Sequence, residues 1–150
     1  MTSWHDPEHW RGLLDGSACP ICIRGEPLDI IATLPATWLT MTDRAPMVGY
    51  VCLVSRIHAV ELHDLDETEA CAFMRDARTV SRALQAVTGA VKLNYAMHGN
   101  VLPHLHMHLF PRHRGDAFEG RVVDPGAIHP PVYTAGAFEA MRGELQRVLG

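Results

Sequence analysis

The longest regular pattern of apolar and polar residues lies mid-chain, between residues 67 and 87. Apolar residues recur there at three- and four-residue intervals, which places them along one face of an α-helix. These residues are Cys71, Phe73, Met74, Ala77, Val80, Leu84 and Val87. Asp66 and Glu69 form a capping box before the run, and Gly89 follows it as a terminator. The pattern therefore predicts a helix over residues 67–87.

Five shorter segments have the composition of β-strands. They are rich in β-branched and other apolar residues and are bounded by Pro or Gly turns. The expected strands are residues 29–34, 37–42, 49–55, 90–97 and 104–111. Pro35 separates the first two, and the turn at His98-Gly99-Asn100 separates the last two. The short connections favour antiparallel pairing.

The ends of the chain complete the predicted fold. Residues 5–14 and 137–149 are expected to be helices, and residues 124–131 a loop. No repeat, linker or low-complexity stretch divides the 150 residues, so we expect a single domain over residues 1–150. The predicted class is α+β: a mainly antiparallel sheet of about five strands, with the long helix packed on it and a C-terminal helix.

Composition and charge exclude several kinds of protein. The chain is 47% hydrophobic and 20% charged, as in a globular domain, and 13 basic against 17 acidic residues give a net charge of −4. No polycationic surface is therefore available for nucleic acid. No apolar run approaches the roughly 18 residues of a membrane span, and we expect neither an anchor nor a signal peptide. Four cysteines without a secretory signal favour reduced thiols or a metal site, and hence a cytoplasmic protein.

Three alternating histidines occupy the last predicted strand. His104, His106 and His108 would share one face of it, while residues 105, 107 and 109 pack into the core behind them. Three imidazoles on one face could hold a phosphate, transfer protons near neutral pH or bind a metal. The alternative is a solvated strand face that happens to be rich in histidine.

This part of the chain resembles the histidine-triad (HIT) family, whose signature is His-x-His-x-His followed by two apolar residues. The matching positions are Asn94, Gly99, His104, His106, His108 and residues 110–112. Upstream, residues 49–58 are similar to the family's Gly-His-x-Leu-Val-x-Pro-x-x-His segment, and residues 63–65 precede the long helix as in many members. The likeness covers about residues 18–116 and implies a HIT-like fold.

The resemblance implies a nucleotide hydrolase or transferase. It would act on the α-phosphate of a purine nucleoside derivative, either a phosphoramidate or a dinucleoside polyphosphate. His106 would attack phosphorus to form a covalent nucleotidyl-histidine, which water or another acceptor then resolves. Neutral imidazole is nucleophilic at physiological pH, which suits this role. His108 would contact the phosphate or assist the leaving group.

Further site residues follow from the same resemblance. Asn94 matches the family's amide near the phosphate and ribose, and the backbone of Gly99 and Asn100 would approach the phosphate closely. Asp43 would hold the ribose hydroxyls. Candidates for the base cleft, with ordinary core packing as their alternative, are Ile30, Ile31, Leu39 and Val54.

Two positions depart from the family pattern. Tyr50 stands where most members have a further histidine behind the triad, and Val101 where many have Ser or Thr contacting the leaving group. A phenol can also form hydrogen bonds, whereas the valine cannot replace a hydroxyl. The resemblance also implies homodimerisation, which an exposed edge of the sheet would permit.

Cys19 and Cys22 have the two-residue spacing with which two thiolates bind one tetrahedral zinc. The spacing alone equally fits a redox pair or a chance pair. The resemblance supplies two further ligands, because some bacterial HIT proteins complete such a site with the positions of His58 and His104. A Cys2His2 site with four protein ligands would be structural rather than catalytic.

The other cysteines and histidines receive simpler interpretations. Cys52 and Cys71 lie in apolar stretches and are expected to be small buried residues. His98 and His113 lie close enough to the triad strand to touch substrate, and the rest are expected at the surface: His5, His9, His63 and His129.

Two other functions compete with the nucleotidyl-histidine enzyme. In the first, a metallohydrolase, His104, His106 and His108 would hold a catalytic zinc. This hypothesis leaves the cysteine pair unexplained. In the second, the protein binds nucleotides without catalysis, which the residues at positions 50 and 101 keep open.

Overall fold

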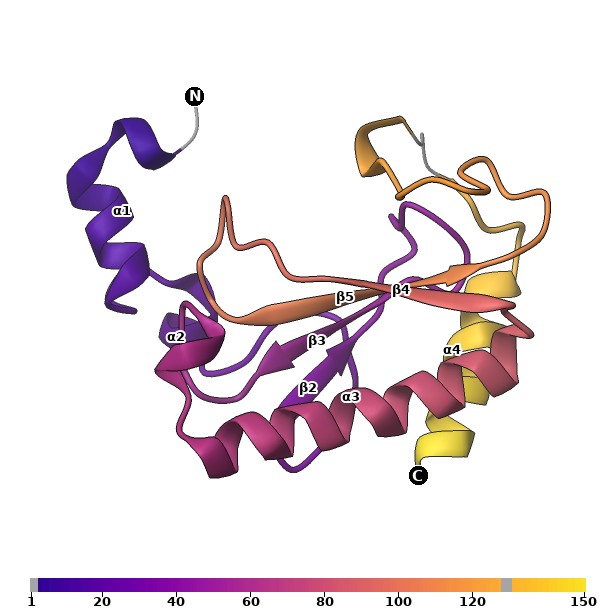
Figure 1. Cartoon of the computed structure of the whole chain (residues 1–150), viewed down its shortest axis with the longest axis horizontal. Coiled ribbons are helices and arrows are strands. Elements are labelled where there is room, and N and C mark those ends of the chain that lie inside the picture. The colour runs from indigo at the N-terminus through magenta and orange to yellow at the C-terminus, as the bar shows by residue number, and fades with distance from the viewer. Residues whose placement is uncertain (1–2, 128–130) are drawn as a thin grey trace.

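A five-stranded sheet forms the centre of the computed structural model, which describes residues 3–127 and 131–150. The strand order is β1-β2-β3-β5-β4, and every neighbouring pair is antiparallel (Figure 1). The strands are β1 (Ile30–Thr33), β2 (Thr37–Thr40), β3 (Val51–Ser55), β4 (Lys92–Ala96) and β5 (His106–Arg112). The predicted α+β class and its antiparallel sheet are confirmed.

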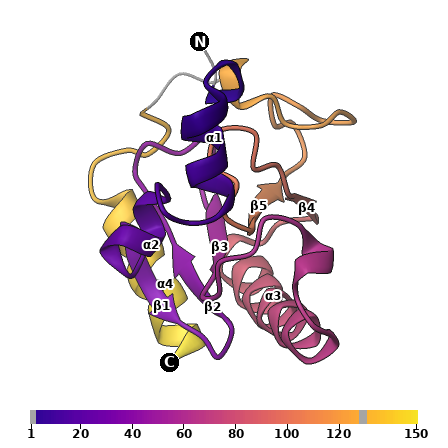
Figure 2. The same ribbon diagram turned by 90° about the vertical axis from the view of Figure 1, so that its left-hand side faces the viewer.

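The described residues also form four α-helices and three short 3-10 turns. The helices are α1 (Pro7–Leu14), α2 (Pro20–Arg24), α3 (Glu67–Thr88) and α4 (Ala137–Leu149). The turns span Ser3–His5, Leu62–Asp64 and Pro125–Ala127. α3 and α4 lie on the same side of the sheet, and α1 and α2 lie at one end of it (Figures 1 and 2). No helix in the described part of the chain has the length and hydropathy needed to cross a membrane.

α3 begins at the predicted residue and ends at Thr88, one residue beyond the predicted end. Asp66 accepts a hydrogen bond from the Glu69 amide while the Glu69 side chain accepts from the Asp66 amide, and Gly89 terminates the helix with a φ of 68°. The expected burial of Cys71 is wrong, because this thiol is exposed. At about 100° per residue, position 71 lies nearly opposite the buried stripe of the helix.

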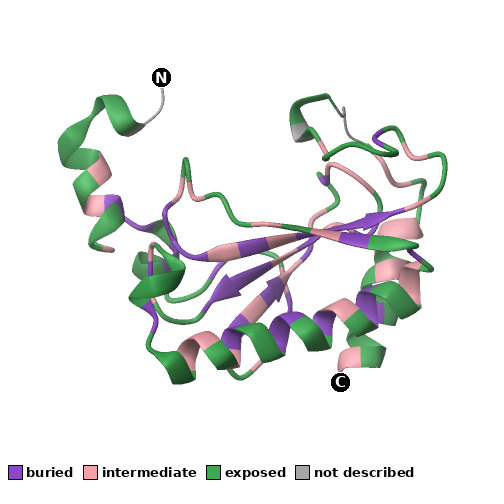
Figure 3. Cartoon of the chain, viewed as in Figure 1, coloured by how far each residue is buried: buried purple, intermediate pink, exposed green. Residues whose placement is uncertain are grey.

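The two faces of the sheet differ in burial. One face packs against α3 and α4 and forms the main core, which includes Leu39, Leu53, Val80, Leu109 and Leu145 (Figure 3). The other face, referred to below as the open face, carries the side chains of His106 and His108, which are half-buried. The fold thus leaves the histidine-bearing face available for a ligand.

From the cysteine pair we expected a zinc knuckle over about residues 17–26, and in the structure this segment contains the short helix α2. Pro20 occupies its first turn, and Gly25 ends it with a φ of 92°. Cys19 and Ile21 pack with Val54 of β3 in a small apolar cluster. α2 is therefore attached to the open face beside the histidines.

Candidate active site and metal centre

The structure divides the three histidines of the triad into two groups. β5 begins at His106, so His104 lies just before the strand, which starts two residues later than predicted. The His106 and His108 rings pair edge to face with centroids 4.7 Å apart, whereas the His104 ring pairs with His58 at 5.1 Å. His104 thus lies before β5, and its ring pairs with His58 rather than with the His106–His108 pair.

His104 belongs instead to a cluster with Cys19, Cys22 and His58. The four ligand atoms lie within 4.8 Å of one another. His104 Nδ1 lies 3.4 Å from Cys19 Sγ, 3.8 Å from Cys22 Sγ and 3.3 Å from His58 Nδ1. His58 Nδ1 lies 3.2 Å from Cys22 Sγ. The four residues proposed from the cysteine spacing and the family resemblance are thus brought together.

Backbone carbonyls orient both imidazoles of this cluster. His104 Nε2 donates to Ser55 O at 2.8 Å, and His58 Nε2 donates to Leu14 O at 2.9 Å. A carbonyl can only accept, so the ring proton of each histidine is on Nε2 and the lone pair of each Nδ1 points into the cluster. Both nitrogens are presented as metal ligands.

His106 has the opposite tautomer. Its Nδ1 lies 2.6 Å from the main-chain oxygen of His104, so Nδ1 carries the proton and donates it. The unprotonated nitrogen of His106 is therefore Nε2. His104 therefore has two contacts: its ring lies in the Cys/His cluster, and its main-chain carbonyl accepts the hydrogen bond from the candidate nucleophile His106.

His108 is held from the other side by Tyr50. The Tyr50 Oη lies 2.6 Å from His108 Nδ1, and the two rings are stacked. Burial lowers the pKa of His108 to about 4, helped by the nearby His106 and His98. His108 is therefore neutral at pH 7.

A cavity of about 590 Å³ opens above these histidines, and both His106 and His108 line it. It is lined by Ile21, Cys52, Val54, His98, Gly99, Asn100, Val101, Leu102, His106 and His108. Gly99 has a φ of 79°, which a glycine adopts readily. Gly99 and Asn100 therefore line the same cavity as the candidate nucleophile His106, as expected. Val101 lines this cavity as well.

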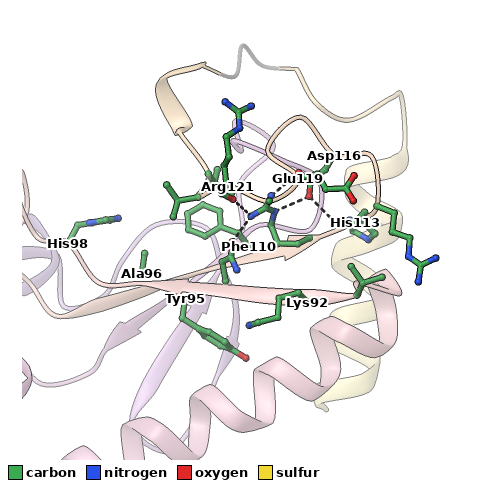
Figure 4. A pocket seen from close by; sticks show the side chains of 16 residues that line it. Lys92, Tyr95, Ala96, His98, Phe110, His113, Asp116, Glu119 and Arg121 are labelled. Atoms are coloured by element: carbon green, nitrogen blue, oxygen red, sulfur yellow. Dashed lines mark hydrogen bonds and ion pairs between the residues drawn. The ribbon is translucent and has the colours of Figure 1, made fainter.

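Asn94 lies on the same face but beside a second cavity, of about 740 Å³, over β4 and the end of β5 (Figure 4). Its Oδ1 accepts from Arg112 Nη1 at 2.5 Å. Arg112 is buried and also donates to both carboxylate oxygens of Asp116 at 2.9 Å. The sequence pattern did not indicate this network, because Arg112 ends β5 and Asp116 lies in the loop that follows, where no helical spacing applies.

Several other expected site residues lie elsewhere. Asp43 is exposed beyond the end of β2 and does not line the cavity above the histidines. Ile31 and Leu39 belong to the main core, so their assignment to a base cleft is wrong. A strand alternates its side chains, and both residues point to the covered face. Val54, on the open face, does line the cavity.

Cys52, His98 and His113 line the two cavities, and the expected full burial of Cys52 is wrong. His98 is exposed and lines both cavities, with its ring 5.6 Å from that of His108. His113 donates from Nε2 to Thr88 O at 3.0 Å and lines the second cavity. Cys52 is half-buried, and burial raises its pKa to about 12. His5, His9 and His63 are exposed, as expected, and His129 lies outside the described residues.

Comparison with known proteins supplies the family. The family model of the HIT domain matches residues 26–115, more than half of the chain. The chain belongs to the HIT family. HIT proteins generally act on nucleotides. No curated protein matches the sequence closely enough to add a more specific relative.

Solved HIT structures share this fold. A histidine triad protein from Bradyrhizobium japonicum is 34% identical, with a TM-score of 0.73 over 81% of this chain and 90% of that chain. A zinc-bound HIT protein from Mycobacterium smegmatis is 18% identical, with a TM-score of 0.66 over 88% of this chain and 96% of its own. A diadenosine triphosphate hydrolase from Plasmodium falciparum is 15% identical, with a TM-score of 0.58 over 81% of this chain and 74% of its own. The last two likenesses concern the fold alone.

Proposed function

We propose that this HIT protein is a nucleotide hydrolase or transferase that acts on the α-phosphate of a purine nucleoside derivative. The substrate would be a nucleoside phosphoramidate or a dinucleoside polyphosphate. His106 is the nucleophile and His108 its neighbour at the phosphate. The diadenosine triphosphate hydrolase among the structural relatives supports a substrate of this class.

The observation that carries this proposal is the hydrogen bond from His106 Nδ1 to His104 O. It leaves the lone pair of Nε2 available for attack on phosphorus without prior deprotonation. As the Nε2–P bond forms and the bond to the leaving group breaks, the ring becomes cationic. The carbonyl of His104 then accepts a charge-assisted hydrogen bond, which stabilises the developing charge.

The second half of the reaction regenerates His106. Water or another acceptor attacks phosphorus, the Nε2–P bond breaks with its electron pair returning to nitrogen, and the nucleoside monophosphate leaves. The backbone at Gly99 and Asn100 approaches the phosphate, and the Asn94 amide is assigned to the rest of the substrate. For Asn94 this contact would be made through its Nδ2, because Arg112 occupies its Oδ1.

The Cys/His cluster fits a structural zinc ion. A tetrahedral site with Zn–N and Zn–S bonds of about 2.0 and 2.3 Å separates its ligand atoms by roughly 3.3–3.8 Å. Four of the six pairs of ligand atoms here lie 3.2–3.8 Å apart, and all six lie within 4.8 Å. Burial and the neighbouring Cys19 raise the pKa of the Cys22 thiol to about 11, and a bound cation would favour its thiolate form. The zinc-bound mycobacterial relative supports this assignment. Bound zinc would supply structural cross-linking rather than catalysis.

The assembly and compartment belong to the same proposal. β4 is an edge strand, paired within the described chain only with β5, and an open edge of this kind permits a homodimer. The thiols of Cys19 and Cys22 persist in a reducing compartment, which favours the cytoplasm. Light scattering during gel filtration would test the dimer.

Mass spectrometry tests the proposed reaction directly. The protein is incubated with adenosine and guanosine phosphoramidates and dinucleoside polyphosphates, quenched and digested. We expect a nucleoside monophosphate adduct on the peptide that contains His106, and none in His106→Ala. Nucleotide binding without an adduct or turnover would favour the non-catalytic alternative. Turnover that needs metal in a protein that stays folded without it would favour the metallohydrolase.

A further inference from the structure

Tyr50 is the aromatic side chain behind His108 on the open face. Its Oη lies 2.6 Å from His108 Nδ1. The Tyr50 ring centroid is 5.8 Å from that of His108 and 5.2 Å from that of Phe110. These ring contacts aim the hydroxyl of Tyr50 at one nitrogen of His108.

The chain before β3 fixes the position of Tyr50 independently of His108. Gly49 has a φ of 78°, and a Cβ there would lie 2.8 Å from Thr88 Cγ2, so the position requires glycine. The Gly49 amide donates to Tyr133 Oη at 2.8 Å. Tyr50 is thus presented to His108 by a constrained backbone.

The protonation states decide the direction of the hydrogen bond. Burial raises the pKa of the Tyr50 phenol and lowers that of His108, so both groups are neutral at pH 7. If His108 Nδ1 donated, the Tyr50 proton would have no acceptor among the described residues. If Tyr50 donates, the half-buried hydroxyl proton and the imidazole lone pair satisfy each other.

We propose that Tyr50 is a positioning residue: it donates its hydroxyl proton to His108 Nδ1 and so keeps the proton of His108 on Nε2. The role of His108 that follows rests on the proposed function. With its proton on Nε2, His108 is a neutral hydrogen-bond donor to a phosphate oxygen. The two neighbouring histidines then have opposite tautomers. A carbonyl fixes His106 with a free lone pair on Nε2, and a hydroxyl fixes His108 with a proton on Nε2.

Nitrogen NMR of protein labelled with 15N-histidine reads these tautomers without any substrate. At pH 7 we expect His108 as the Nε2–H form and His106 as the Nδ1–H form. Tyr50→Phe keeps the stacked ring and removes the donor, so His108 should shift to a mixture of tautomers. Tyr95→Phe is the matched control, because its hydroxyl donates to Ser81 on α3, away from the open face. An Nδ1–H form of His108 in the wild type, or a Tyr50→Phe spectrum unchanged at His108, would overturn the proposal.

Kinetics separates this inference from the proposed function. With a nucleoside phosphoramidate, Tyr50→Phe should still form the His106 adduct but lose about tenfold in kcat/KM, the equivalent of one modest hydrogen bond. Tyr95→Phe should match the wild type. Full kcat/KM in Tyr50→Phe would refute the positioning role alone. Absence of an adduct in the wild type would refute the proposed function and leave the NMR result to decide the tautomer. Tyr50→His should bring no gain, because the phenol already supplies the donor.

Discussion

The hydrogen-bond partner of each imidazole sets its role at this site. His58 and His104 each donate Nε2–H to a carbonyl and turn Nδ1 toward the two cysteines. His106 donates Nδ1–H to a carbonyl and leaves Nε2 unprotonated. Identical side chains are thus prepared as metal ligands or as a nucleophile by the backbone groups around them.

Replacement of His106 tests this assignment most directly. His106→Ala removes the covalent route, so we expect turnover of any nucleotide substrate to be abolished, with fold and zinc content unchanged. His108→Ala removes one phosphate contact and should cost on the order of 10²-fold. Steady-state rates with circular dichroism and metal analysis provide the measurement. A His106→Ala rate within about tenfold of wild type, roughly 1.4 kcal/mol of barrier, would contradict the covalent mechanism.

The pKa of His108 predicts a pH dependence of stability. Its folded value, about 4, lies below the ordinary value of 6.5, so the unfolded chain binds more protons between these limits. The contribution of His108 is complete above pH 6.5 and is lost as the pH falls toward 4. We expect the melting temperature of His108→Ala to fall less steeply than that of wild type over this window. The exposed His9→Ala is the control and should follow the wild-type slope.

At the scale of elements, the sequence pattern predicted local features, whereas long-range contacts were predicted only where the family resemblance supplied them, as for the Cys/His cluster. The capping box of α3 and its terminating Gly89 lie within the segment they define. The placement of β5 between β3 and β4 depends on pairing across the chain. The turn of His104 away from the triad depends on Ser55 O, which no spacing along residues 104–108 encodes.

Asp76 connects two secondary-structure elements, and the apolar pattern of the sequence did not indicate this connection. This buried carboxylate on α3 accepts hydrogen bonds from the Ala36 amide and the Thr37 hydroxyl, each at 2.9 Å. It ties α3 to the β1–β2 turn. Asp76→Ala leaves two donors unpaired, and we expect a loss of about 2–4 kcal/mol in the free energy of unfolding.

Urea denaturation measures this loss. Glu8→Gln is the control variant, because it removes a carboxylate that is exposed on α1. The control should stay within about 0.5 kcal/mol of wild type. An equally small effect of Asp76→Ala would show that the turn does not depend on this carboxylate.

At the scale of the whole molecule, the Cys/His cluster joins segments that are distant in sequence. Cys19 and Cys22 lie at the N-terminal end, His58 follows β3 and His104 precedes β5. α1 and α2 lie at one end of the sheet (Figures 1 and 2), and Cys19 directly precedes α2. A metal at this point would cross-link the N-terminal segment to the strand that carries His106, so metal binding is coupled to folding.

Metal content is therefore the decisive whole-molecule measurement. Purified protein should contain about one zinc per chain. Cys19→Ser should lose it and melt at a substantially lower temperature, whereas Cys71→Ser, at an exposed thiol on α3, should retain both metal and stability. Cobalt accepts the same tetrahedral ligands, so the cobalt-loaded protein should show thiolate absorption and keep its turnover, because the metal holds the backbone and does not touch the substrate.

Two results would contradict this assignment in different ways. Wild type that is free of metal, fully folded and fully active would refute the site itself. Full zinc in Cys19→Ser would require a ligand set without that thiol, and the three triad histidines would then be the alternative. That set requires the His104 ring to release Ser55 O and turn toward His106, so the hydrogen bond of His104 Nε2 would be lost. The same histidine NMR spectrum distinguishes the two, since the His104 signals match those of wild type only if its ring stays in the Cys/His cluster.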